Sequence, residues 1–208
     1  MIKAIIFDCF GVLTGEGLVP FREQHFGNNP ELLKASKSLT HQMVLGVVTF
    51  EDMLCGFADM AGLTYEAVVE EIETLARVKN NELLDFIKNT LKTRYKIGVL
   101  SNIGEHKFET VFSREEQELF DSVTLSCDIG YVKPDPMAYE TAAQMLDVEP
   151  DQAIFVDDRD QYVEGAKKVG MYTIKYISFT QFREDLERLI GEHNREKSLT
   201  FNHKNDRI

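Results

Sequence analysis

The chain has 208 residues, of which 43% are hydrophobic and 28% are charged, a balance typical of a soluble globular protein with one core and room for a small insertion. Its formal net charge of -12 argues against nucleic acid and against an anionic membrane surface as the main partner. No apolar stretch is long enough to span a membrane, no signal-peptide pattern opens the chain, and the three cysteines are too widely spaced for a disulfide framework, so we expect a reducing, cytoplasmic setting.

The first predicted element is a short buried strand that ends at Asp8. Residues 5–7 form its apolar run, and Gly11 opens the loop that follows. Cys9 comes directly after Asp8, and the alternation of side chains along a strand turns it toward the opposite face. We therefore interpret Asp8 as a carboxylate presented at the end of a sheet, and Cys9 as a packing residue.

Residues 15–80 show no strand pattern and are predicted to form a helical module inserted after the first strand. Apolar residues recur in this segment at helical spacing. Thr49 and Thr64 occupy positions typical of helix N-caps. An insertion at this point would lie over the carboxyl ends of the strands, where open α/β sheets bind their ligands.

Short apolar runs alternate with helical patterns over residues 81–190. The runs that predict strands are residues 97–100, 123–125, 154–156 and 172–174. This alternation predicts an α/β fold with a Rossmann-like parallel sheet, covered by helices on both faces and formed by residues 1–14 and 81–190. Residues 191–208 are polar and lack periodicity, so we expect them to form a flexible C-terminal tail.

Helix boundary signals within this region agree with the alternation. Ser113 begins a capping-box pattern, and Asp135 precedes a proline at the first helical position. Gly170 stands where a helix would end.

Polar side chains follow three of the predicted strands. Asp8 follows the first strand. Ser101 and Asn102 follow the strand at 97–100, and Asp157 and Asp158 follow the strand at 154–156. Each residue alone has an ordinary explanation as a turn or helix-cap residue. Because parallel strands end at the same edge of a sheet, their joint occurrence predicts a polar site there.

A lysine in a proline-containing loop, Lys133, completes a pattern of four segments that resembles a known family. The segments are residues 6–13, 99–102, 132–136 and 154–158, and residues 164–171 match the helix that usually follows the last one. In order and spacing they resemble the haloacid dehalogenase-like (HAD) hydrolase superfamily, in the subfamily with a helical cap after the first motif. The resemblance covers roughly residues 1–176 and implies a Rossmann-like core with residues 15–80 as its cap domain.

The resemblance implies a nucleophile and a metal site. Asp8 would attack phosphorus and form an aspartyl-phosphate. Mg²⁺ would be held by the carboxylate of Asp8, by the backbone carbonyl of Phe10 and by Asp157, which are the oxygen ligands that a hard cation prefers. Asp158 would support these metal ligands from behind.

The resemblance also implies a phosphate site. The Ser101 hydroxyl and the backbone N–H of Asn102 would hold phosphoryl oxygens at a helix start. Lys133 would bind the phosphoryl group and neutralise the charge that develops between it and the nucleophile. The implied partner is a small phosphorylated metabolite, whose identity the sequence does not specify, and the oligomeric state is equally open.

Phe10 departs from the pattern of the related phosphatases. Those enzymes carry an aspartate two residues after the nucleophile, which protonates the leaving oxygen and then activates water. Phenylalanine can do neither, and such acid–base catalysis typically contributes about 10²- to 10⁴-fold to the rate. We therefore expect a phosphatase that is weakened, or one whose substrate has a good leaving group, such as an acyl or enol phosphate.

Two alternatives account for Phe10 differently. A 2-haloacid dehalogenase carries an aromatic residue at this position and releases a halide that needs no proton. Those relatives work without Mg²⁺, lack the paired aspartates at 157 and 158, and use a cap arginine, for which Arg22 is the candidate here. A catalytically inactive relative that binds a ligand or a protein is the second alternative.

Overall fold

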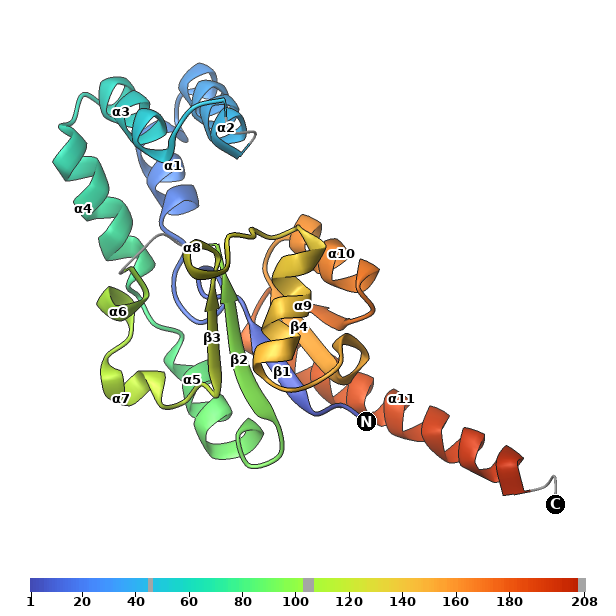
Figure 1. The fold of residues 1–208 in the computed structure, drawn as a ribbon. Coiled ribbons are helices and arrows are strands. Elements are labelled where there is room, and N and C mark those ends of the chain that lie inside the picture. Colours follow the sequence, from blue (N-terminus) through green and yellow to red (C-terminus); the bar gives the residue numbers. More distant parts are fainter. Residues whose placement is uncertain (45–46, 103–106, 206–208) are drawn as a thin grey trace. The chain divides into compact units, whose positions relative to one another are not determined.

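Five parallel strands form one sheet in the computed structural model, which describes residues 1–44, 47–102 and 107–205 (Figure 1). The strands are β1 (Ala4–Phe7), β2 (Lys96–Ser101), β3 (Ser122–Leu125), β4 (Ala153–Asp157) and β5 (Tyr172–Lys175). Their order is β3-β2-β1-β4-β5, and every neighbouring pair is parallel. The predicted α/β class with a Rossmann-like parallel sheet is confirmed. Because β1 lies between β2 and β4, the residues that follow these three strands emerge next to one another.

Two apolar clusters cover the two faces of the sheet. Along β1, Ile5 and Phe7 belong to one cluster, whereas Ala4 and Ile6 belong to the other. The first cluster takes side chains from α5, α6 and α11, and the second takes them from α9 and α10. The helices of this part of the chain are α5 (Asn81–Phe86), a π-helical turn (Ile87–Leu91), α6 (Lys107–Val111), α7 (Arg114–Gln117), α8 (Ser126–Ile129), α9 (Pro136–Met145), a 3₁₀ turn (Pro150–Gln152), α10 (Asp160–Lys168) and α11 (Phe179–Asn205).

The helix boundaries expected here occur in the structure. Ser113 forms a capping box with Glu116 at the start of α7. The Asp135 side chain accepts a hydrogen bond from the N–H of Met137 at the start of α9, with a proline in the first turn. Gly170 follows α10 with a positive φ of 91°, a conformation that glycine adopts without steric cost.

The C-terminal segment contains more helix than the sequence indicated. Helix α11 continues to Asn205, through most of the segment from residue 191 onward for which a flexible tail was expected. Its first half is anchored by the buried Phe182 and Leu186, and adding residues to an established helix costs far less than starting one. His193 is also buried, and its Nδ1 lies 3.0 Å from the Tyr172 hydroxyl. Residues 206–208 of the predicted tail lie outside the described residues.

The helices of residues 1–44, 47–102 and 107–205 include none that is both long enough and apolar enough to cross a lipid bilayer.

The inserted segment is a helical unit with an apolar core of its own. Its helices are α1 (Leu18–Phe26), α2 (Pro30–Val44), α3 (Phe50–Ala61) and α4 (Tyr65–Ala76). Phe21, Phe26 and Phe57 are fully buried in this core. Thr49 and Thr64 cap α3 and α4 as expected, and Thr49 does so through a complete capping box.

The insertion begins and ends at neighbouring positions. The chain divides into one unit of Met1–Leu13 with Asn80–Ile208 and a second unit of Thr14–Lys79. The Asn80 N–H donates to the Leu13 carbonyl at 3.0 Å. On the side of the insertion, Thr14 and Lys79 form an isolated antiparallel bridge.

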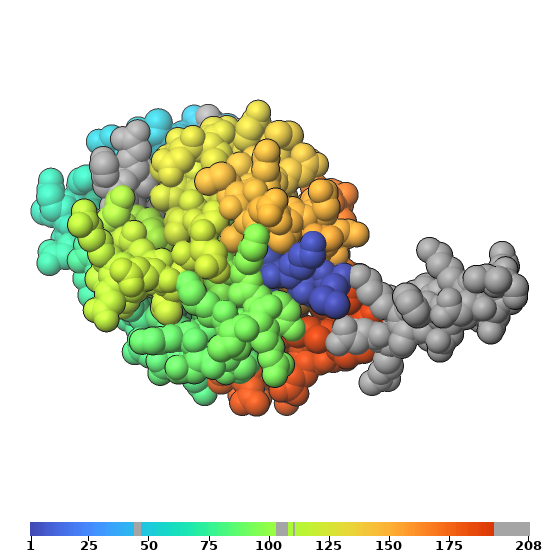
Figure 2. Space-filling view, turned by 60° about the horizontal axis from the view of Figure 1, so that its bottom comes forward, coloured from blue at the N-terminus to red at the C-terminus, as the bar shows by residue number. Residues whose placement is uncertain are grey.

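At the amino ends of the strands, the first residues of the chain lie between the segments that lead into β2 and β4 (Figure 2). The Lys3 N–H donates to the Gln152 carbonyl at 2.8 Å, and the Lys3 carbonyl accepts from the Lys96 N–H at 2.9 Å. These bonds hold the strands together at the amino edge of the sheet. The polar loops that follow β1, β2 and β4 lie at the opposite, carboxyl edge.

Candidate active site

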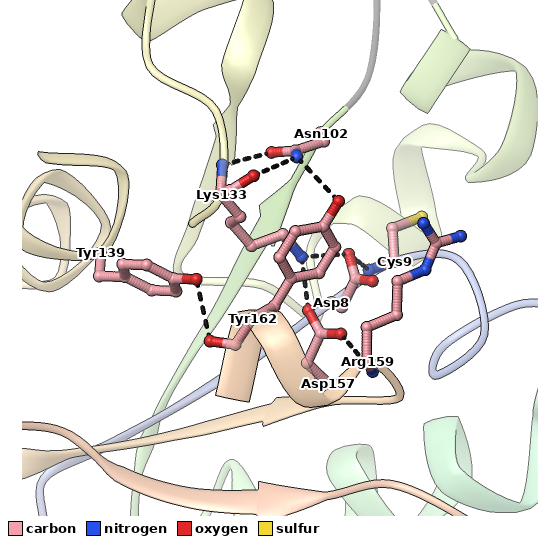
Figure 3. A network of polar contacts seen from close by, with 8 residues as sticks. All are labelled: Asp8, Cys9, Asn102, Lys133, Tyr139, Asp157, Arg159 and Tyr162. Atoms are coloured by element: carbon pink, nitrogen blue, oxygen red, sulfur yellow. Dashed lines mark hydrogen bonds and ion pairs between the residues drawn. The ribbon is translucent and has the colours of Figure 1, made fainter. Parts of the chain in front are cut away.

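Two buried carboxylates stand at the ends of neighbouring strands (Figure 3). Asp8 follows β1 and is 6% exposed, and Asp157 ends β4 and is fully buried. Asp8 Oδ1 accepts a hydrogen bond from the Cys9 N–H at 2.7 Å, and Asp157 Oδ1 accepts one from the Arg159 N–H at 2.9 Å. Backbone N–H groups therefore fix the orientation of both carboxylates before any ligand arrives.

Lys133 joins these two carboxylates. Its Nζ lies 2.8 Å from Asp8 Oδ1 and 2.7 Å from Asp157 Oδ2, and the residue is only 2% exposed. Burial by itself would lower the pKa of Lys133, but the charges of Asp8 and Asp157 outweigh it and raise that pKa. The lysine is thus a buried cation between two carboxylates, and its interpretation as a solvated loop residue is excluded.

A third carboxylate completes a cluster that suits a divalent cation. Asp8, Asp157 and Asp158 each offer an oxygen, and these oxygens lie within 4.8 Å of one another. Burial, followed by the charge of Asp8, raises the pKa of Asp157 to about 7, although Lys133 and the Arg159 N–H act in the opposite direction. Carboxylates crowded in this way repel one another, and a hard cation with oxygen ligands relieves that repulsion. The donor set therefore fits Mg²⁺.

Gly11 provides the space that Asp158 occupies. A Cβ atom at this position would lie 2.6 Å from Asp158 Oδ2, and the backbone has a φ of +85°. Both observations require glycine in the loop after β1. The loop after β1 and the residue that follows β4 are thus packed directly against each other.

Ser101 has a hydroxyl with an unused hydrogen-bonding capacity. It ends β2 and is 1% exposed, and its Oγ has no hydrogen-bond partner among the described residues. A buried hydroxyl without a partner costs free energy. A ligand that accepts or donates a hydrogen bond here would remove that cost.

Asn102 has a role that the sequence did not reveal. Its side chain accepts a hydrogen bond from the Lys133 N–H at 2.8 Å and donates one to the Lys133 carbonyl at 3.0 Å. The amide is therefore occupied by the lysine loop. The expected contact of the Asn102 backbone N–H with phosphate stays a prediction.

Two tyrosines of the site were also missed. The Tyr162 ring lies 4.9 Å from Lys133 Nζ, with the Phe155 ring on the same ammonium at 5.2 Å. The Tyr139 hydroxyl donates to the Tyr162 carbonyl at 2.9 Å. The sequence did place Tyr162 in the first turn of the helix that follows Asp157 and Asp158. It did not show which face of that helix points toward the site, so the contact with Lys133 could not be predicted.

The Phe10 side chain packs against the apolar core. The residue is half-buried and packs against the apolar cluster that contains Phe7 and Cys9. Cys9 itself is fully buried there, in agreement with its interpretation as a packing residue. In the helical unit, Arg22 donates from Nη1 to the Thr40 hydroxyl at 3.0 Å, so this arginine has a partner within its own unit.

Known proteins resemble this chain in both sequence and fold. Residues 2–170 match the model of the haloacid dehalogenase-like hydrolase family. The chain is 36% identical over 212 residues to acyl-CoA dehydrogenase family member 10 of Mus musculus, a match that covers 91% of this chain but 19% of the mouse protein. It is 25% identical over 124 residues to pyrophosphatase PpaX of Bacillus cereus (strain G9842), covering 59% of this chain and 54% of PpaX.

A solved structure shows the same fold. The HAD family enzyme from Bacteroides thetaiotaomicron, in complex with magnesium and inorganic phosphate, has a TM-score of 0.59 and 19% identity, with 88% of this chain and 99% of that chain covered. The match spans less than two thirds of each of the two curated relatives.

Proposed function

Because the chain belongs to the haloacid dehalogenase-like hydrolase family, we propose that it is a Mg²⁺-dependent phosphatase that acts on a small phosphorylated metabolite. The observation that carries the proposal is the cluster of Asp8, Asp157 and Asp158 at the carboxyl edge of the sheet, in which the first two carboxylates share the buried Lys133. The names of two relatives support a phosphorylated substrate, since PpaX is a pyrophosphatase and the Bacteroides enzyme binds magnesium and phosphate.

Asp8 is the nucleophile of the proposed reaction. One of its carboxylate oxygens forms a bond to phosphorus while the bond from phosphorus to the leaving oxygen breaks, which gives an aspartyl-phosphate. Water then releases inorganic phosphate and restores the carboxylate. The ion pair of Asp8 with Lys133 at 2.8 Å keeps a positive charge beside the reacting group as charge moves through the transition state.

Mg²⁺ would be held by the carboxylates of Asp8 and Asp157 and by the Phe10 carbonyl, with Asp158 supporting them. When bound, the cation supplies charge neutralisation for the phosphoryl oxygens. The Ser101 hydroxyl, which has no hydrogen-bond partner within the described part of the chain, donates to a phosphoryl oxygen in this assignment. The phosphoryl group is thereby held from the side of β2 as well as from the side of β1.

Phe10 limits the reaction to good leaving groups. Its ring packs against the apolar cluster and offers no proton to the leaving oxygen. When the phosphoryl group is transferred, an acyl phosphate releases a carboxylate and an enol phosphate releases an enolate. Both are less basic than an alkoxide, so these substrates depend least on the missing acid. The proposed substrate class is therefore a metabolite with an activated phosphate.

The dehalogenase alternative has less support. A dehalogenase needs no metal, whereas this site holds three carboxylates with oxygens within 4.8 Å. Its substrate carboxylate needs a cap arginine, whereas Arg22 bonds to Thr40. Phe10 is the residue in its favour, and packing accounts for that side chain.

The test uses purified protein with Mg²⁺ and a panel of phosphate esters that includes acetyl phosphate. We expect phosphate release from acetyl phosphate, loss of that release in Asp8→Asn, and faster turnover of alkyl phosphates in Phe10→Asp, by up to about 10²-fold. Phe10→Leu is the matched control, because it also alters the packing but cannot move a proton.

Two results would contradict the proposal. One is the absence of phosphate release from every ester in both the wild type and Phe10→Asp. The other is metal-independent chloride release from 2-chloropropionate, which would assign the chain to the dehalogenases.

A further inference from the structure

One side chain holds the main chain of the catalytic lysine across 31 positions of sequence. Asn102 accepts from the Lys133 N–H at 2.8 Å and donates to the Lys133 carbonyl at 3.0 Å (Figure 3). Asn102 directly follows Ser101, the last residue of β2. The two hydrogen bonds therefore fix the position of the loop that contains Lys133 relative to the end of β2.

Tyr162 contacts both the lysine and the asparagine. Its ring lies 4.9 Å from Lys133 Nζ, where a cation gains from the negative face of an aromatic ring. Its hydroxyl accepts from Asn102 Nδ2 at 3.4 Å. Its own carbonyl accepts from the Tyr139 hydroxyl at 2.9 Å, so α10 is in turn fixed by α9.

The task of Lys133 explains why this support is needed. A lysine side chain has four rotatable bonds and loses rotamer entropy when it is fixed. Its Nζ must stay within hydrogen-bond distance of Asp8 and Asp157 together. Small displacements of a charged group in a catalytic site lower the reaction rate strongly.

We propose that Asn102 and Tyr162 are positioning residues that act on the reaction through Lys133 and do not themselves contact the substrate. The inference rests on the proposed phosphatase activity. Asn102 orients the lysine backbone, and Tyr162 orients the ammonium group and the Asn102 amide.

The kinetic test compares substitutions that remove one contact at a time. With acetyl phosphate and Mg²⁺, Asn102→Ala loses both backbone hydrogen bonds and lowers kcat by about 10- to 100-fold, while Tyr162→Phe loses one weak bond and lowers it by at most about fivefold. Tyr162→Leu, which also loses the ring, lies between these limits. KM changes by less than about threefold in each, because the contacts serve the transition state.

A matched control and a double-mutant cycle separate positioning from general packing. Tyr172→Phe also removes a tyrosine hydroxyl bond, to His193 at 3.0 Å, but at the amino end of β5, and its kcat stays at the wild-type value. In the Lys133→Met background, Asn102→Ala causes no further loss, because the residue through which it acts is gone.

A structural readout decides the inference even if the enzymatic proposal fails. Brief acetylation followed by peptide mass spectrometry leaves Lys133 unmodified in the wild type and in Tyr172→Phe, and modifies it in Asn102→Ala. Lys167, whose side chain is 51% exposed, reacts in all three proteins. Equal protection of Lys133 in Asn102→Ala overturns the inference, as does an unchanged kcat or an equal loss in the Lys133→Met background. Absence of turnover with intact protection in the wild type counts only against the phosphatase assignment.

Discussion

Replacement of Lys133 by methionine is expected to destabilise the protein in a manner that depends on pH. The substitution keeps the length and the apolar body of the side chain but removes the cation between Asp8 and Asp157. Both carboxylates are then buried and close together with no compensating charge. Removal of one partner from a buried ion pair costs about 3–5 kcal/mol, and we expect a loss of that size at pH 8 without divalent metal.

The pH dependence follows from Asp157. Burial and the charge of Asp8 raise its pKa from the ordinary value of 3.8 to about 7 in the presence of the lysine. Because Lys133 opposes this rise, its removal raises the pKa of Asp157 further. A carboxyl whose pKa is raised in the folded state stabilises the folded protein while the carboxyl is protonated. This contribution to the free energy of unfolding is lost as the pH rises through the folded-state pKa.

Two pH ranges result for the difference in unfolding free energy between wild type and variant. Below about pH 6, Asp157 is protonated in both proteins and the difference is constant. Above about pH 7, the wild type releases this proton while the variant retains it, so the difference grows by up to about 1.4 kcal/mol for each pH unit.

The measurement is urea unfolding followed by circular dichroism, in EDTA, at several values between about pH 5 and pH 9. The matched control is Lys167→Met, because the Lys167–Glu164 pair is exposed and worth at most about 1 kcal/mol. The reasoning would be refuted if the difference in unfolding free energy between wild type and Lys133→Met varied by less than about 0.5 kcal/mol over the whole pH range. A Lys133→Met loss no larger than that of the control would refute it as well.

Two further predictions concern the metal and the glycine loop. Mg²⁺ should raise the melting temperature more at pH 8 than at pH 6, because Asp157, with its pKa raised to about 7, must lose its proton to bind the cation, and Asp157→Asn should remove most of the increment; an equal increment at both values would disprove the link. Gly11→Ala should cost about 1–3 kcal/mol, because the backbone has a φ of +85° and the new Cβ would meet Asp158 Oδ2 at 2.6 Å. Thermal unfolding measures this loss, and a smaller loss of the same substitution in an Asp158→Ala background would show how much of it is the clash.

The strands and the convergence of the acidic residues could be predicted from the sequence for a simple reason. An apolar run followed by a polar residue marks the end of a buried strand, and parallel strands bring such ends together. Asp8 and Asp157 could therefore be placed near each other although they are 149 positions apart in the sequence. The assignment of Lys133 to this site rested on the resemblance to a family, because a lysine in a loop is ordinarily solvated.

The supporting contacts could not be predicted in the same way. The side chain of Asn102 and the ring of Tyr162 meet Lys133 only after the loop and α10 pack against the sheet. Which face of α10 points inward depends on where the helix begins, and that boundary is among the least certain quantities in a sequence. The extent of α11 was missed because its later residues lack apolar periodicity, whereas a helix already anchored by Phe182 and Leu186 extends at little cost.

The close approach of Leu13 and Asn80 has a consequence for the history of the fold. Asn80 donates its backbone N–H to the Leu13 carbonyl and its side-chain amide to the Val12 carbonyl, so the two points at which the chain leaves and re-enters the core are joined within the core itself. A segment attached at such a junction can be lengthened, shortened or exchanged by recombination while the strand that presents Asp8 keeps its own contacts. The strand that presents Asp8 and the inserted helical unit are thereby separable pieces of one chain.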